Sequence, residues 1–181
     1  MYSASRFPNS LNIMTPAQEA KSGRAQAEAF WKDMQKASPG VKCFQLWGNH
    51  EDRAWKQIMR NAPALEKMFE KPMSELLRFD GVTTLASSLD ELEIDGTLFH
   101  HGWSCRPGYH VQYFMKNVVH GHTHHAGVTY LNAGGKTLWE LDCGVLADFK
   151  ARPMLYRATV TSKWTTGFGW IDGWGPRFCP L

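Results

Sequence analysis

The chain has 181 residues, 43% of them hydrophobic, and a formal net charge of +3 at pH 7. This length and apolar content suit one domain with a buried core and leave little room for two. No apolar run approaches the ~20 residues of a membrane-spanning helix, which excludes a helical membrane protein. We therefore expect a single soluble domain over residues 1–181, with no membrane partner. The small positive charge fits a phosphate-bearing partner but carries little weight.

The cysteines show no pairing pattern. They are widely spaced and include no C-x-x-C motif, and the N-terminus has no basic segment followed by an apolar one. This usage favours free thiols in a reducing compartment, so we expect a cytoplasmic protein. The spacing also argues against a small structural zinc protein, which needs a closed tetrahedral ligand set. The four cysteines are Cys43, Cys105, Cys143 and Cys179.

The first predicted element is a helix. Residues 1–14 show no periodicity and indicate a loop or tail. Thr15, followed by a proline and then by Gln18, has the pattern of a capping box at a helix start. Apolar residues continue at helical spacing until a Ser-Pro-Gly sequence at 38–40 ends the pattern. The sequence thus predicts a helix from about Pro16 to Ala37.

A buried strand is predicted next. The segment 41–47 is short, apolar and rich in strand-forming residues, with Pro-Gly before it and Gly-Asn after it. The Gly-Asn-His-Glu sequence at 48–51 then lies at the carboxyl end of that strand, where open α/β sheets collect their ligands. From Asp52 the pattern turns helical, breaks near Pro63 and resumes irregularly to Leu77.

From Val82 onward the apolar pattern alternates, which predicts strands. A strand over 82–86 precedes two strands at 91–94 and 97–101, which flank an Asp-Gly pair typical of a hairpin turn. The second hairpin strand ends in His101-Gly102. A loop containing proline and glycine then leads to Tyr109.

The remaining chain is also predicted as strands. Residues 117–119 lead into a histidine cluster, and 128–131 with 136–141 indicate a hairpin around a turn at 132–135. A later strand is predicted over 156–161. The tail from Gly167 to Leu181 is rich in glycine, tryptophan and proline, and we leave it unassigned as turn-rich.

Four histidines lie within six residues at positions 120, 122, 124 and 125. Imidazole is bulky, polar and partly charged near neutral pH, so packing four of them together costs desolvation and repulsion. A bound metal ion would relieve both. We therefore interpret this cluster as one half of a metal site.

Three loops, each after a predicted strand, carry Gly-Asn-His-Glu at 48–51, His-Gly at 101–102 and Gly-His-Thr-His at 121–124. Their order and spacing resemble the calcineurin-like metallophosphoesterase superfamily, whose later motifs are G-N-H-[DE], H-G and G-H-x-H. The resemblance covers residues 41–143 well and the tail poorly. It implies an α/β fold, a two-sheet αββα sandwich, and metal-dependent hydrolysis of phosphate mono- or diesters.

The resemblance also implies roles for individual residues. Asn49, His101 and His122 would bind one metal ion, and His124 would bind the other. His50 would bind no metal and would donate a proton to the leaving-group oxygen. Two divalent ions ~3.5–4 Å apart would clamp the phosphoryl group and activate a bridging water. Manganese, iron, zinc and cobalt all suit such ligands.

The sequence departs from the family at its beginning. The family's D-x-H and G-D motifs are absent, and Asp33, the only aspartate before Asn49, lies in the predicted helix. The fold would thus be N-terminally incomplete, lacking its first strand-loop units. Without those carboxylates, two cations would lack the anionic ligands that offset their repulsion. We expect either coding sequence upstream of Met1 or a shortened gene with a weakly active or inactive product.

Several residues keep two interpretations. His101 is preferred to His100 as a ligand because it precedes the glycine of the motif and points to the other side of the strand. We expect His110, His120 and His125 to be surface residues or to support the ligands, with a further option of contacting a substrate phosphate.

Other polar and aromatic residues also remain open. Glu51 and Asp52 favour the start of the following helix, although either could substitute for a missing carboxylate. Trp103 is expected to pack in the core, with stacking on a nucleobase as the alternative. Phosphoester substrates that suit this chemistry include nucleic acids and nucleotides. The alternative function is an inactive or weakly active remnant that binds metal or phosphate.

Overall fold

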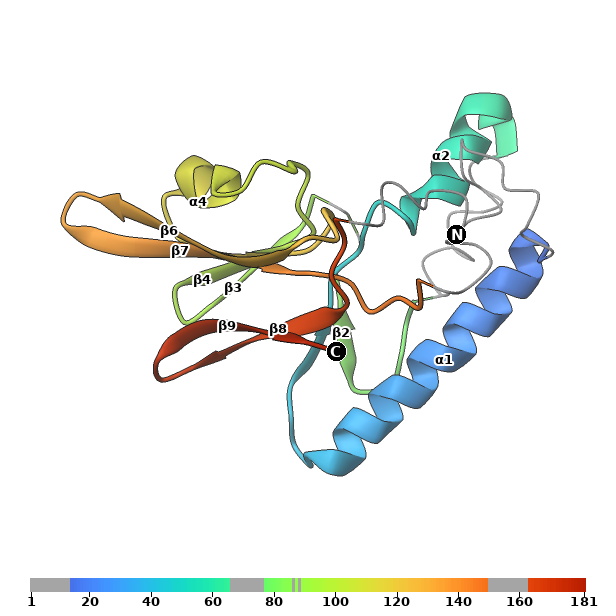
Figure 1. Ribbon diagram of the computed structural model, residues 1–181. Coiled ribbons are helices and arrows are strands. Elements are labelled where there is room, and N and C mark those ends of the chain that lie inside the picture. The colour runs from blue at the N-terminus through green and yellow to red at the C-terminus, as the bar shows by residue number, and fades with distance from the viewer. Residues whose placement is uncertain (1–13, 66–76, 86, 88, 150–162) are drawn as a thin grey trace. The chain divides into compact units, whose positions relative to one another are not determined.

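The computed structural model describes residues 14–65, 77–85, 87, 89–149 and 163–181. The protein is mixed α/β and forms two compact units, residues 1–88 and 89–181, which we describe separately. Figure 1 shows the elements of each. The predicted strand at 156–161 and most of the predicted N-terminal tail lie outside the described residues. In the part of the chain that is described, no helix has the length and apolar character needed to cross a membrane.

The first unit begins with α1 (Pro16–Ala37), whose bounds confirm the predicted helix. Thr15 Oγ1 accepts a hydrogen bond from the Gln18 N–H at 3.3 Å, and Gln18 Oε1 accepts one from the Thr15 N–H at 2.9 Å. The reciprocal bonds satisfy two N–H groups that a helix start otherwise leaves without partners. The capping box read from the sequence is therefore present.

A short parallel strand pair lies beside α1. Strand β1 (Cys43–Gln45) is shorter than the predicted strand and pairs with β2 (Val82–Thr84). The Trp31 indole N–H of α1 donates to Gln45 Oε1 at 3.1 Å. The helix α2 (Asp52–Asn61) and the 3-10 turn η1 (Pro63–Leu65) follow, so the predicted helix after Asp52 is confirmed.

The second unit contains a five-stranded mixed sheet of order β3-β4-β5-β7-β6. Strands β4, β5 and β7 are parallel to one another, while β3 and β6 are antiparallel edge strands. Parallel strands end at the same edge of a sheet, so the loops that follow β4, β5 and β7 emerge together. The strands are β3 (Glu91–Ile94), β4 (Thr97–His100), β5 (Asn117–His120), β6 (Ala126–Ala133) and β7 (Lys136–Cys143).

Both predicted hairpins of this unit are confirmed. Asp95 and Gly96 join β3 to β4 with φ angles of 49° and 74°, the left-handed conformation that a tight hairpin turn requires. Gly134 and Gly135 join β6 to β7 with φ angles of 57° and 78°. Asp-Gly and Gly-Gly adopt such angles at low cost, which is why the sequence located these turns.

The sheet is covered on both faces. Helix α4 (Tyr109–Phe114) lies over one face, and the hairpin of β8 (Gly167–Asp172) and β9 (Gly175–Pro180) lies over the other (Figure 1). Successive side chains of β7 point to opposite faces of the sheet. Glu140 contacts α4 on one face, and Leu141 lies beside Gly169 of β8 on the other. The apolar core includes Leu98, Val111, Val118 and Leu141.

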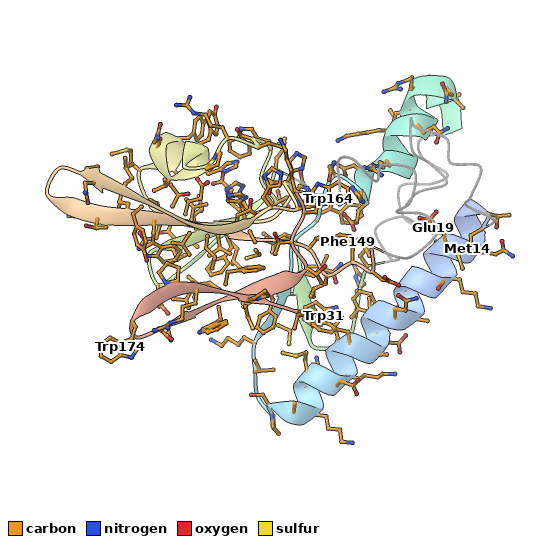
Figure 2. The ribbon with its side chains drawn as sticks, viewed as in Figure 1. Met14, Glu19, Trp31, Phe149, Trp164 and Trp174 are labelled. Atoms are coloured by element: carbon orange, nitrogen blue, oxygen red, sulfur yellow. The ribbon has the colours of Figure 1, made fainter. Side chains whose placement is uncertain are left out.

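The tail is therefore a hairpin rather than a turn-rich segment. Its glycines and prolines obscured the alternation, yet Gly167 and Gly169 are required where β8 packs closely against β9 and β7. Trp174, at the tip of the hairpin, is 90% exposed (Figure 2). The hairpin closes one face of the sheet where its glycines allow close packing and where Phe178 lies against Gly144.

We predict that Gly169→Val destabilises the second unit by about 1–3 kcal/mol through overpacking. A Cβ atom at this position would lie 2.8 Å from Leu141 Cδ2 and 2.9 Å from Cys143 Sγ. Urea unfolding measures the effect. Gly173→Ala is the control, since a Cβ there meets nothing within 4 Å. Equal stability of the Gly169 variant and the wild type would contradict the packing described.

Candidate metal centre

Two motif loops meet at the carboxyl edge of the sheet. His101 follows β4, and the loop 121–124 follows β5. The Gly121 N–H donates to the His101 carbonyl at 3.1 Å, which holds the two loops together. Gly102 has a φ of 91°, and a Cβ there would lie 3.2 Å from His120 Nδ1. The glycine of the H-G motif therefore permits a close approach that a side chain would prevent.

His101 and His122 face each other across this junction. His122 Nδ1 lies 3.2 Å from His101 Nε2, and the ring planes are 84° apart. Two imidazole ligands of one ion, with bonds of about 2.0–2.1 Å at tetrahedral angles, have nitrogens about 3.3 Å apart. Burial lowers the pKa of His122, and the nearby His120 lowers it further. The His122 ring is thus favoured in the neutral form that binds metal.

The backbone of this loop is constrained. His122 and His124 have φ angles of 69° and 62°, in the left-handed region that side chains disfavour. The His124 carbonyl accepts the Thr165 N–H at 3.0 Å, and its ring lies 4.4 Å from the Trp164 ring. Thr123, between them, donates its hydroxyl to Asp142 of β7. These contacts fix the loop in a conformation of higher energy, a feature that clusters at functional sites.

The predicted residues of the first unit also follow a strand. Asn49 and His50 lie between β1 and α2. Glu51 Oε2 accepts the Gly48 N–H at 2.9 Å, and Asp52 Oδ1 accepts the Trp47 indole N–H at 2.5 Å. Both carboxylates thus stabilise their own loop, as expected for residues that begin a helix.

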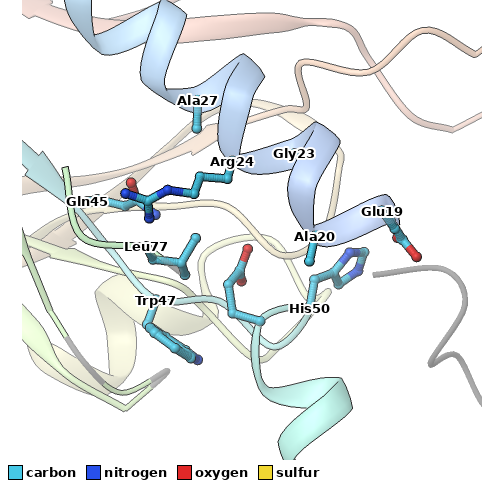
Figure 3. A pocket seen from close by; sticks show the side chains of 10 residues that line it. Glu19, Ala20, Gly23, Arg24, Ala27, Gln45, Trp47, His50 and Leu77 are labelled. Atoms are coloured by element: carbon cyan, nitrogen blue, oxygen red, sulfur yellow. The ribbon is translucent and has the colours of Figure 1, made fainter. Parts of the chain in front are cut away.

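His50 is held by a neighbouring arginine. Arg53 Nη2 lies 2.8 Å from His50 Nε2. Because a guanidinium can only donate, Nε2 accepts and the proton of the neutral ring is on Nδ1. His50 also lines a cavity of about 300 Å³ together with Trp47 and Leu77, against α1 (Figure 3). In this arrangement the ring is neutral, and it must take up a second proton before it can act as an acid.

The structure reveals a second, fully buried cluster in the second unit. His110, His120 and Glu140 are 0%, 3% and 3% exposed, so His110 and His120 are not the surface residues we had allowed for. His120 Nε2 lies 3.3 Å from Glu140 Oε1, and His110 Nδ1 lies 3.8 Å from Oε2. The possible ligand atoms lie within 4.8 Å of one another, so the group could hold a metal ion.

Glu140 ties this cluster to the helix. Its carboxylate accepts the N–H groups of Gly108, His110 and Val111, at 2.8, 2.7 and 2.9 Å, at the start of α4. Burial alone would raise the pKa of Glu140, but His120 and these N–H groups lower it to about 2. The buried carboxylate is therefore ionised. The sequence gives only a weak signal for this role, a glutamate between Trp139 and Leu141 in a strand that also contains Lys136 and Asp142.

The imidazoles around Glu140 differ in the direction of their pKa shifts. Burial, then the neighbouring histidines, lower the pKa of His100 to about 3 and that of His110 to about 4. Burial also lowers the pKa of His120, but Glu140 and the Gly121 carbonyl outweigh it and the net shift is upward. The upward shift of the His120 pKa thus reflects the carboxylate of Glu140 beside it.

Trp103 lies at the border of this cluster. It is 45% exposed, and its ring centroid is 4.8 Å from that of His110 in an edge-on contact. Trp103 is thus partly buried at the edge of the core. Its stacking on a nucleobase stays a prediction.

Comparison with known proteins gives no relative: no family model matches the sequence, and no curated protein does. The likeness to metallophosphoesterases therefore depends on the three motif loops and their positions after β1, β4 and β5.

We predict that Glu140→Gln lowers the free energy of unfolding by about 2–4 kcal/mol, because an amide cannot accept all these hydrogen bonds and leaves buried donors unsatisfied. Urea unfolding in the presence of a chelator measures this loss without a contribution from metal. Glu93→Gln is the control, since Glu93 is a half-exposed partner of Lys116. A loss no greater than in the control would contradict the role of Glu140 in holding α4.

Proposed function

We propose that this chain is a metal-dependent phosphoesterase that hydrolyses phosphate mono- or diesters. The observation that carries the proposal is the 3.2 Å approach of His101 Nε2 to His122 Nδ1 on neighbouring strand-end loops. Each residue belongs to a motif that the family resemblance associates with metal binding. The strands that precede the loops supply the context that the resemblance requires.

The donors present fit a divalent ion at the His101 and His122 pair. Their separation matches two ligands of one ion, and imidazole nitrogen suits zinc, iron, cobalt or manganese. The family resemblance further implies the side-chain oxygen of Asn49 as a ligand of this ion and His124 as a ligand of a second ion. The bound ions would supply an activated water and neutralise charge on the phosphoryl oxygens.

The chain's own residues account for the protonation of the leaving group. His50 donates to the departing oxygen, which avoids release of a strongly basic alkoxide. To act as the acid, His50 must be the imidazolium, with a proton on each ring nitrogen, so the Arg53 guanidinium, which lies 2.8 Å from Nε2, has to move aside when the ring takes up its second proton.

A binding function without catalysis is the second candidate. In the motif loop of the first unit, Glu51 and Asp52 are engaged by Gly48 and Trp47. This favours a protein short of anionic ligands for two ions, which would bind one ion or a phosphate without turnover.

Metal content tests the ligand assignment. We expect His122→Ala to lose at least one equivalent of metal per chain, measured by elemental analysis after manganese or zinc loading and desalting. His125→Ala, on the same loop, should retain the wild-type content. Equal metal content in the wild type and the His122 variant would refute the pair as a site.

Leaving-group dependence tests His50. We expect His50→Ala to lower turnover of an alkyl phosphodiester by about 10² to 10⁴, while metal content is unchanged. Hydrolysis of a p-nitrophenyl ester should fall much less, since p-nitrophenolate leaves without protonation. A similar loss with both substrates would mean that His50 positions the substrate and is not the acid. No turnover of either ester by the metal-loaded wild type would favour the binding function.

A further inference from the structure

The buried cluster around Glu140 contains polar atoms that the protein itself does not satisfy. His100 Nε2, His110 Nδ1 and His120 Nε2 are buried and have no hydrogen-bond partner among the described residues. An unsatisfied buried polar atom costs about 1–3 kcal/mol. The three rings contact one another, and two of these atoms, His110 Nδ1 and His120 Nε2, also lie near the Glu140 carboxylate.

The hydrogen bond at His120 Nδ1 determines which nitrogen of the neutral ring carries the proton. His120 Nδ1 lies 2.9 Å from the Gly121 carbonyl, which can only accept, so Nδ1 carries a proton. The lone pair of the neutral ring is then at Nε2, 3.3 Å from Glu140 Oε1. Two acceptors cannot face each other at this distance, so either a proton or a metal ion lies between them. The contact falls outside hydrogen-bond geometry, which favours the metal ion.

We propose that a zinc-type divalent cation binds to His110 Nδ1, His120 Nε2 and Glu140 Oε1, at a site separate from the His101 and His122 pair. Two histidines and one glutamate are a known zinc ligand set. Glu140 Oε1 accepts one backbone N–H and keeps a lone pair for the ion. The distance of 3.3 Å between His120 Nε2 and Glu140 Oε1 matches two ligands of one ion. The ligand atom of His110 lies within 4.8 Å of the other two.

A fourth ligand position is available. A cavity of about 60 Å³ adjoins His120 and Glu140 and is also lined by Thr123 and Asp142. It exceeds the space of about 10–15 Å³ that one water needs, and its walls are polar. A water in this cavity completes four-coordination.

Binding has a consequence for the neighbouring loop. His110 Nε2 lies 3.3 Å and 3.4 Å from the N–H groups of Trp103 and Ser104, so in the metal-free protein it accepts and Nδ1 is protonated. A cation at Nδ1 moves the ring proton to Nε2 and releases both N–H groups. Metal binding therefore strengthens the attachment of α4 while it loosens the backbone just after His101-Gly102.

The test uses the full chain with His101→Ala and His122→Ala, which removes the other pair. We expect this background to retain one equivalent of zinc after desalting and to melt at a higher temperature with zinc than with chelator. Adding His110→Phe, which keeps the ring volume, should abolish both effects. Adding His125→Ala instead should abolish neither.

Two outcomes would overturn the site: no bound zinc in the double-variant background, or zinc retained with His110→Phe. His120→Gln is a second variant that removes a ligand. Unfolding of the His110→Phe and His120→Gln variants in the presence of a chelator shows which of them is folded without metal. Hydrogen exchange gives an independent readout, because zinc should speed exchange of the Trp103 and Ser104 amides, whereas a His120–Glu140 proton pair would leave it unchanged. These results do not depend on whether the proposed enzymatic function is correct, because the background variant lacks His101 and His122.

Discussion

The second unit depends on one buried carboxylate. Glu140 extends from the middle of the sheet and accepts the first N–H groups of α4, which lack partners within so short a helix. Six residues form no stable helix in water, so α4 exists because this anion and the sheet hold it. The same carboxylate orders His110 and His120 around itself. Its removal would therefore affect the helix and the histidine cluster together.

The parallel arrangement of β4, β5 and β7 explains why the candidate histidines lie at one edge of the sheet. Each strand delivers its loop to the same side, so residues 21 positions apart in sequence, His101 and His122, come within 3.2 Å. Strand alternation then separates two histidine sets. His100 and His120 end their strands as buried residues, while His101 and His122 continue into partly exposed loops. One edge thus presents a buried cluster and an accessible pair.

Local signals made much of this predictable. The capping box at Thr15, the Asp95-Gly96 turn and the strand-loop motifs each depend on a few adjacent residues, and the structure contains the elements they indicated. The cluster at Glu140 depends on contacts across about 30 residues, which no local pattern reveals. The β8–β9 hairpin escaped prediction because the glycines and prolines among its aromatic residues indicate turns as readily as strands. The roles of Asn49, His50, His101, His122 and His124 remain predictions.

The left-handed backbone at His122 and His124 has an evolutionary consequence. Glycine or asparagine at either position would relieve this strain by about 1 kcal/mol, but either change would delete an imidazole. If the proposed site is correct, a lineage that no longer used it would gain stability from one of these two substitutions. Retention of both histidines would then reflect selection for the site rather than for stability.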